Sequence, residues 1–130
     1  MNDSAFQSAT AIDAIGWGLL AALRRMEDSG IIVGYRVALD AQRLGRPLLA
    51  VMRLDAEAGA HQRVTDLCRD LPAVRECLHL SGDDGYLIRL AVSGVAELED
   101  VIARFRLFGR ASTSLVLSAP VADKPFAAPR

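Results

Sequence analysis

The spacing of apolar residues changes several times along the chain and predicts an alternation of helices and strands. Residues 1–11 are small and polar, so we expect a loose arm there. Leucines and a methionine between positions 19 and 26 recur at helical spacing, and Gly30 follows where a helix C-cap favours glycine. The next segment, Ile31–Leu39, is rich in Ile, Val and Tyr and predicts a strand.

From residue 47 onward the periodicity alternates between that of strands and that of amphipathic helices. Pro72 ends one helix, and the pair Asp84-Gly85 favours a tight hairpin. We expect a strand at 48–54, a helix at 60–71, strands at 74–80 and 86–92, a helix at 95–105 and a strand at 113–117. This order predicts an α+β, ferredoxin-like βαββαβ domain of the dimeric α+β barrel type, preceded by a helix and a strand.

The domain organisation follows from the same pattern. We expect an N-terminal arm and helix at 1–30, a linking strand and connection at 31–46, the ferredoxin-like domain at 47–119 and an irregular tail at 120–130, which is rich in proline.

Strict alternation along the expected strands assigns each residue to one face of the sheet. The face toward the helices would carry Leu48, Ala50, Met52, Leu54, Val74, Leu78, Leu80, Ile88, Leu90 and Leu117. The opposite face has no helix layer to cover it and is still largely apolar, which favours a partner's sheet as its cover. The expected dimer interface on that face consists of Leu49, Val51, Cys77, His79, Leu87 and Val116.

Composition and charge narrow the class of protein. Apolar residues make up 52% and charged residues 24%, which is typical of a globular chain. Fifteen basic groups against sixteen acidic ones give a net charge of −1, which disfavours binding to nucleic acid through a broad basic field. The apolar stretches are too short to span a bilayer, and the first residues lack the basic start of a secretory signal. With two cysteines, we expect a cytoplasmic protein with free thiols.

The expected hairpin at residues 81–86 carries the best candidate chemistry. Adjacent carboxylates at Asp83 and Asp84 favour an ammonium group, and free backbone N–H groups of a turn favour a carboxylate. The same residues also suit a plain turn, because Asp and Gly tolerate its backbone geometry. The two histidines, His61 and His79, have no neighbour at metal-ligand spacing, so we expect neither a metal nor a cofactor.

Two stretches resemble the Lrp/AsnC family of transcriptional regulators. The run from Arg24 to Tyr35, RRMEDSGIIVGY, is similar to the junction that follows the DNA-binding unit in that family. The run from Leu80 to Leu87, LSGDDGYL, is similar to the family's Gly-Asp-x-Asp hairpin. The resemblance implies a ligand-sensing domain that pairs through its sheet into dimers, assembles further into octamers and binds amino-acid effectors near the hairpin. The implied ligand-binding residues are Ser81, Gly82, Asp83, Asp84, Gly85 and Tyr86.

The sequence departs from the family pattern at two places. Only one helix fits between Ile12 and Gly30, so the turn, the second helix and most of the recognition helix of a helix-turn-helix are expected to be missing. Gly85 stands where the family usually has its second aspartate. An enclosed ammonium group needs an anion, so we expect common amino acids to bind weakly or not at all, or the effector to be a non-standard one.

We therefore expect a regulatory protein, not an enzyme, that senses an effector and oligomerises. It would act by itself or by mixing with full-length relatives, and DNA binding by this chain alone is not expected. Two alternatives stay open: a transcriptional regulator that binds DNA through a remodelled N-terminal helix, and a small enzyme, such as a monooxygenase, on a dimeric α+β barrel.

Overall fold

The chain divides into two units between Ala38 and Leu39. The structure, a computed structural model, describes residues 3–82 and 85–128, with side chains from residue 16 onward. The first unit contains the N-terminal helix and the second contains all the strands. Each unit is described by itself.

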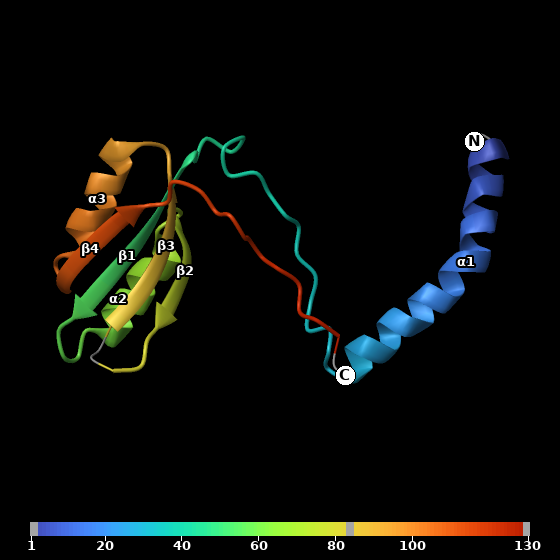
Figure 1. Cartoon of the computed structure of the whole chain (residues 1–130), viewed down its shortest axis with the longest axis horizontal. Helices are drawn as coiled ribbons and strands as arrows, with labels where there is room; N and C mark the ends of the chain where they lie inside the picture. The colour runs from blue at the N-terminus through green and yellow to red at the C-terminus, as the bar shows by residue number, and fades with distance from the viewer. Residues whose placement is uncertain (1–2, 83–84, 129–130) are drawn as a thin grey trace. The chain divides into compact units, whose positions relative to one another are not determined.

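A four-stranded antiparallel sheet forms the centre of the second unit (Figure 1). Its strands are β1 (Leu48–Ala56), β2 (Val74–His79), β3 (Gly85–Val92) and β4 (Gly109–Leu115). They lie in the order β2-β3-β1-β4, so the two strands that are hydrogen-bonded on both sides are β1 and β3. This is the ferredoxin-like order, and the fold expected from the sequence is confirmed.

Both helices of this unit, α2 (His61–Asp70) and α3 (Val95–Phe105), cover the same face of the sheet (Figure 1). Alternate residues of β1 point into the space between sheet and helices, which gives the strand its alternating burial. The largest fully buried side chains are Phe105, Met52, Leu54, Ile88, Leu90, Val64 and Val92. One contiguous core therefore holds the two layers together.

The backbones of β1 and β4 lie so close together at Gly109, the first residue of β4, that no side chain would fit there. A Cβ atom placed on Gly109 would lie 2.0 Å from the backbone oxygen of Asp55. The adjoining bond, from the Glu57 N–H to the Phe108 oxygen, is 2.7 Å long. Glycine at position 109 therefore allows β4 to approach β1 where the two strands begin to pair.

In the strand expected at 74–80, the face assignment is correct for Val74 and wrong for the residues after a β-bulge, which changes the register. Val74 pairs with Leu90, but Cys77 pairs with Ile88, and the pairing shifts between Val74 and Glu76. The extra residue moves every later side chain to the other face. Cys77 and His79 therefore point toward α2, not into the expected dimer interface, and Leu78 points away from the helices.

We call the face of the sheet away from α2 and α3 the open face. Its side chains follow from the strand pairing and belong to Leu49, Val51, Arg53, Asp55, Glu76, Leu78, Leu87, Arg89, Ala91, Arg110, Ser112 and Ser114. No helix among the described residues of this unit packs against it. Beyond β4, Val116 extends the pairing by donating its N–H to the Leu49 oxygen at 2.8 Å.

The N-terminal helix is longer than the sequence indicated. Helix α1 runs from Asp3 to Asp28, so the loose arm expected at residues 1–11 is wrong for residues 3–11. It ends as expected: Gly30 has φ of 81°, and the Ile32 N–H donates back to the Met26 oxygen at 3.0 Å. In the described part of the chain before Gly30, this is one continuous helix (Figure 1).

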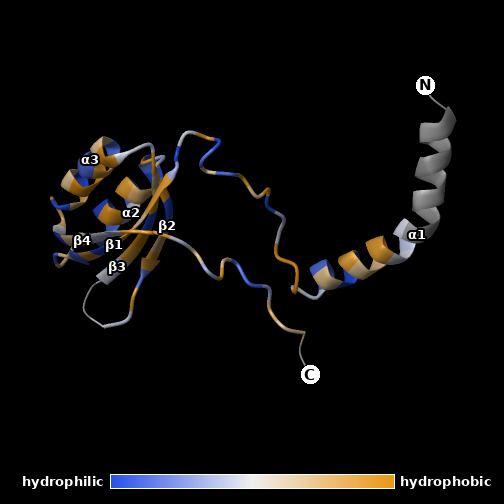
Figure 2. Ribbon diagram, turned by 45° about the horizontal axis from the view of Figure 1, so that its top comes forward, coloured by the Kyte–Doolittle hydropathy of each residue, from blue (hydrophilic) through white to orange (hydrophobic). Residues whose placement is uncertain are grey.

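The strand expected at Ile31–Leu39 is not formed. The segment is irregular, and apolar and polar residues follow one another along it (Figure 2). Its alternate residues are exposed apolar side chains: Ile31, Val33, Tyr35, Val37 and Leu39. The residues suit a strand, but the backbone finds no neighbouring strand to pair with among the described residues.

A single arginine joins the connection before β1 to the body of the second unit. Arg46 donates through Nη1 to the Ala91 oxygen at 2.9 Å and to Glu97 Oε1 at 2.8 Å. Glu97 also accepts hydrogen bonds from the backbone and the hydroxyl of Ser93. The segment that leads into the sheet is therefore fixed to β3 and to the start of α3.

The last strand, β4, begins four residues earlier and ends two residues earlier than expected. It ends at Leu115, and Leu117, which was assigned to the face under the helices, is 95% exposed. The described residues after Val116 form neither helix nor strand. None of the helices in the described residues combines the length and the apolar character needed to cross a bilayer.

Candidate functional site

The hairpin between β2 and β3 is the site that the sequence singles out. Its Gly82 has φ of 99°, a conformation that glycine adopts at little cost. The Leu80 N–H donates to the Gly85 oxygen at 2.9 Å and closes the hairpin. Asp83 and Asp84, the two carboxylates of the predicted site, lie outside the described residues.

The residues that follow the turn point to opposite faces of the sheet. Tyr86 is 3% exposed and lies under α2, where its hydroxyl is hydrogen-bonded to His61 Nδ1. Its ring stacks on His79, with centroids 4.8 Å apart. Gly85 lies on the open face, opposite Asp55 of β1. The structure therefore divides the predicted site, because Tyr86 belongs to the covered face and Gly85 to the open one.

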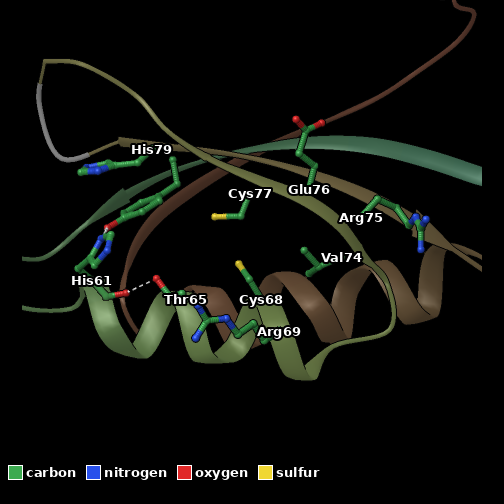
Figure 3. A pocket seen from close by; sticks show the side chains of 10 residues that line it. His61, Thr65, Cys68, Arg69, Val74, Arg75, Glu76, Cys77 and His79 are labelled. Atoms are coloured by element: carbon green, nitrogen blue, oxygen red, sulfur yellow. Dashed lines mark hydrogen bonds between the residues drawn. The ribbon is translucent and has the colours of Figure 1, made fainter. Parts of the chain in front are cut away.

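A hollow of about 430 Å³ lies between α2 and β2, beside this aromatic group (Figure 3). The side chains of Cys68 and Cys77 point toward each other within it, and both thiols are free (Figure 3). Burial, followed by the hydrogen bond with Cys77, raises the pKa of Cys68 to about 12. A thiol with that pKa stays protonated at neutral pH and is a poor nucleophile.

The histidines and cysteines of this hollow do not form a metal centre. In the residues that the structure describes, no three histidine, cysteine or carboxylate side chains converge as metal ligands would. Sequence reasoning missed that His61, His79 and Tyr86 meet, because α2 and the bulged β2 bring them together from distant positions.

A second hollow, of about 420 Å³, opens at the hairpin end of the open face. It is lined by Arg53, Leu54, Asp55, Gly85, Tyr86, Arg110 and Ser112. The strand pairing sets Asp55 between Gly85 of β3 and Arg110 of β4, and sets Arg53 beside Ser112. Arg110 Nη2 lies 3.4 Å from Asp55 Oδ2. Two guanidinium groups and one carboxylate therefore surround this hollow.

Sequence reasoning did not propose these charged residues as a site. The available signal was local: on β1 the open-face positions change from apolar at Leu49 and Val51 to charged at Arg53 and Asp55. Their meeting with Arg110 depends on the register between β1 and β4, which the sequence does not state.

Away from this hollow the open face is mainly apolar, although the ion pair between Glu76 and Arg89 lies among its leucines and valines. Leu49, Val51 and Val116 line a shallow hollow of about 390 Å³ together with the first residues of the C-terminal tail. Leu49 is 41% exposed and Leu78, on β2, is 40% exposed. Of the six expected interface residues, Leu49, Val51, Leu87 and Val116 share this face, whereas Cys77 and His79 do not. We call Leu49, Val51, Leu78, Leu87 and Val116 the apolar patch.

Comparison with known proteins identifies the domain. Residues 49–126 match the family model described as the Lrp/AsnC ligand binding domain. A leucine-responsive regulatory protein of Haemophilus influenzae is 29% identical over 86 residues, which cover 64% of this chain and 52% of that protein. The chain thus spans about half the length of this curated relative.

Solved structures show the same fold. LrpC of B. subtilis superposes with a TM-score of 0.72 at 20% identity, covering 82% of this chain and 76% of that one. A transcriptional regulator from Neisseria meningitidis, solved as an L-Met complex, has a TM-score of 0.71 at 22% identity and covers 81% of this chain and 72% of its own. Because the matched family model spans more than half of the 130 residues, the chain belongs to the Lrp/AsnC family through its ligand-binding domain.

Proposed function

We propose that this chain is a regulatory module that senses an amino-acid effector and assembles with itself through the open face of its sheet, without catalysing a reaction. The observation that carries the proposal is that the open face combines the apolar patch with a charged hollow beside the hairpin. The match to a family of ligand-binding domains and the L-Met complex of a structurally similar regulator support it.

The apolar patch supports self-association. A lone chain would leave Leu49 and Leu78 each about two-fifths exposed to water. A second copy offers the same patch, so a two-fold arrangement covers both at once. We propose a homodimer as the smallest assembly and an octamer as a larger one.

The dimer is tested by light scattering at micromolar concentration. Leu49→Asp places a charge in the patch and should produce monomers, because a buried unpaired carboxylate is costly. Leu107→Asp is the matched control: this leucine is 77% exposed and lies in the loop between α3 and β4, so its variant should assemble as the parent does. A monomeric parent chain would contradict the proposed interface.

Effector sensing is tested by thermal unfolding in the presence of the standard L-amino acids, one at a time. A ligand that binds the folded state raises the melting temperature in a concentration-dependent way. Gly85 by itself predicts weak binding, but the strand pairing sets the carboxylate of Asp55 beside that position, so at least one amino acid should do so. If none does at millimolar concentration, the sensing proposal is wrong and an assembly role alone is left.

We propose that the chain does not bind an operator by itself. The described residues before Gly30 form one helix, whereas a helix-turn-helix needs two, and the net charge of −1 gives little attraction to phosphate. Mixed assembly with full-length relatives in the cytoplasm would connect the module to DNA.

A mobility-shift titration at physiological salt tests this part of the proposal. We expect no specific shift. A tight shift that is abolished by Arg24→Ala together with Arg25→Ala, the two exposed arginines near the end of α1, would instead favour a regulator that contacts DNA through this helix.

A further inference from the structure

The open face holds an acidic and a basic group side by side next to a position without a side chain. Asp55 is paired across β1 and β3 with Gly85, and across β1 and β4 with Arg110. Because Gly85 carries no side chain, its position leaves the Asp55 carboxylate uncovered on that side and contributes to the hollow of about 420 Å³. The sequence alone offers no anion at position 85 to bind the ammonium group of a ligand. The pairing of β1 with β3 places the carboxylate of Asp55 beside that position.

The ion pair at this position is weak and therefore available to a ligand. Arg110 Nη2 and Asp55 Oδ2 are 3.4 Å apart, and their side chains are 88% and 55% exposed. Exposed pairs at such a distance contribute little to stability. Arg53 and the Ser112 hydroxyl lie next to them in the same hollow, so a second guanidinium and a hydroxyl donor are within the same site.

Adjacent opposite charges match a particular class of small molecule. A free α-amino acid carries its ammonium and carboxylate on the same carbon, so both groups contact neighbouring side chains at once. Arginine binds carboxylates through paired N–H groups, and aspartate accepts hydrogen bonds from ammonium. A monocarboxylate or an amine alone would satisfy only half of this arrangement.

We propose that this hollow binds the zwitterionic head of a free α-amino acid, with Asp55 holding the ammonium group and Arg110 and Arg53 holding the carboxylate. The Ser112 hydroxyl donates a further hydrogen bond to the carboxylate. The assignment rests on the proposed sensing function and names the residues that recognise the effector. It moves the ammonium partner from the hairpin turn to the end of β1.

The proposal is tested by calorimetry with three variants of the full chain. Asp55→Asn and Arg110→Gln each remove one charge from the hollow. Glu76→Gln is the matched control, because Glu76 is a carboxylate on the same face, also paired with an arginine, Arg89, at 3.2 Å, and lies outside the hollow. All three residues are at least partly exposed, and circular dichroism checks that each variant folds.

The probes are the amino acid that the parent chain binds most tightly, its desamino analogue and its amino-alcohol analogue. Asp55→Asn should weaken the amino acid at least tenfold and leave the desamino analogue unchanged. Arg110→Gln should weaken the amino acid to a similar extent and leave the amino alcohol unchanged. Glu76→Gln should bind all three as the parent does.

Three results would overturn the assignment, and they are distinguishable. If the parent binds an amino acid and the two hollow variants bind it as Glu76→Gln does, sensing stands and the site lies elsewhere. If the variants change dimer dissociation and not ligand affinity, Asp55 and Arg110 pair with a second copy. If the parent binds no amino acid, both the site and the sensing function are wrong.

Discussion

The two faces of the sheet are built from the same strands but have opposite characters. On β1 the residues toward the helices, Ala50, Met52 and Leu54, are at most 2% exposed. Their neighbours on the open face run from apolar at Leu49 to charged at Asp55. Alternation along one strand thus separates residues that hold the fold together from residues available to partners and ligands, so substitutions on the two faces should have different consequences.

The largest expected effect lies on the covered face. Phe105 is fully buried between α3 and the sheet, and Phe105→Ala should lower the free energy of unfolding by about 3–5 kcal/mol, because it leaves a cavity. Leu107→Ala, two residues later and 77% exposed, should change it by less than about 0.5 kcal/mol. Urea unfolding at one protein concentration measures both. Equal costs would mean that the two positions do not differ in packing.

A comparable loss of stability is expected at the close contact between the backbones of β1 and β4. Gly109→Ala places a methyl group 2.0 Å from the Asp55 oxygen, which is backbone and cannot move without shifting β1. We expect a loss of about 2 kcal/mol or more, as for an overpacked core. Gly94→Ala is the control, because a Cβ there meets nothing within 4 Å. Thermal unfolding distinguishes the two variants, and equal melting temperatures would show that β4 can shift away from β1 at little cost.

A smaller effect, which depends on pH, is expected at Glu97, a residue of α3 that lies on neither face of the sheet. Hydrogen bonds from Ser93, and then from Arg46, lower the pKa of Glu97 to about 2. A lowered carboxyl pKa stabilises the fold above the unfolded pKa of about 4.3, and this stabilisation is lost as the pH falls toward 2. Glu97→Gln should therefore cost about 1 kcal/mol at pH 7, since the pair is partly exposed, and almost nothing near pH 2. A cost independent of pH would contradict the ion pair.

The smallest expected effect tests a polar atom on the covered face. Thr113 pairs with Met52 of β1, and among the described residues nothing is hydrogen-bonded to its buried Oγ1. Thr113→Val keeps the shape and removes the unpaired hydroxyl, so stability should stay unchanged or rise by up to about 1 kcal/mol. Chemical denaturation measures it. A clear loss would indicate that this hydroxyl has a partner in the folded protein.

The fold was predictable because its signals are local. The helical spacing before Pro72, the Asp-Gly pair and the alternation in β1 each occur within a few residues, and together they specify the ferredoxin-like order. The bulge in β2 left only a weak signal in the sequence, the two consecutive charged residues Arg75 and Glu76 that interrupt the alternation, and the pairing with β3 shows where the extra residue lies. That single residue explains why Cys77 and His79 were assigned to the wrong face.

The candidate site was predictable only in part for a related reason. The turn is recognisable because Gly82 and the two aspartates are consecutive in the sequence, whereas the residues that surround Gly85 in space are distant from it in the sequence. Asp55 and Arg110 reach it through two strand pairings that join distant parts of the chain. Ile31–Leu39 illustrates the converse, because a good strand sequence forms no strand without a partner.

The apolar patch and the charged hollow share one face of one sheet, so the proposed effector binding and the proposed assembly would be thermodynamically linked if either one changes the other. Whatever factor an effector adds to the association constant of two copies, association must add to the affinity for the effector. The apparent affinity for the effector would then depend on the protein concentration, so a dilute chain and an abundant one would be half-saturated at different effector concentrations. A measured dissociation constant for the effector therefore has meaning only together with the concentration of the chain at which it was obtained.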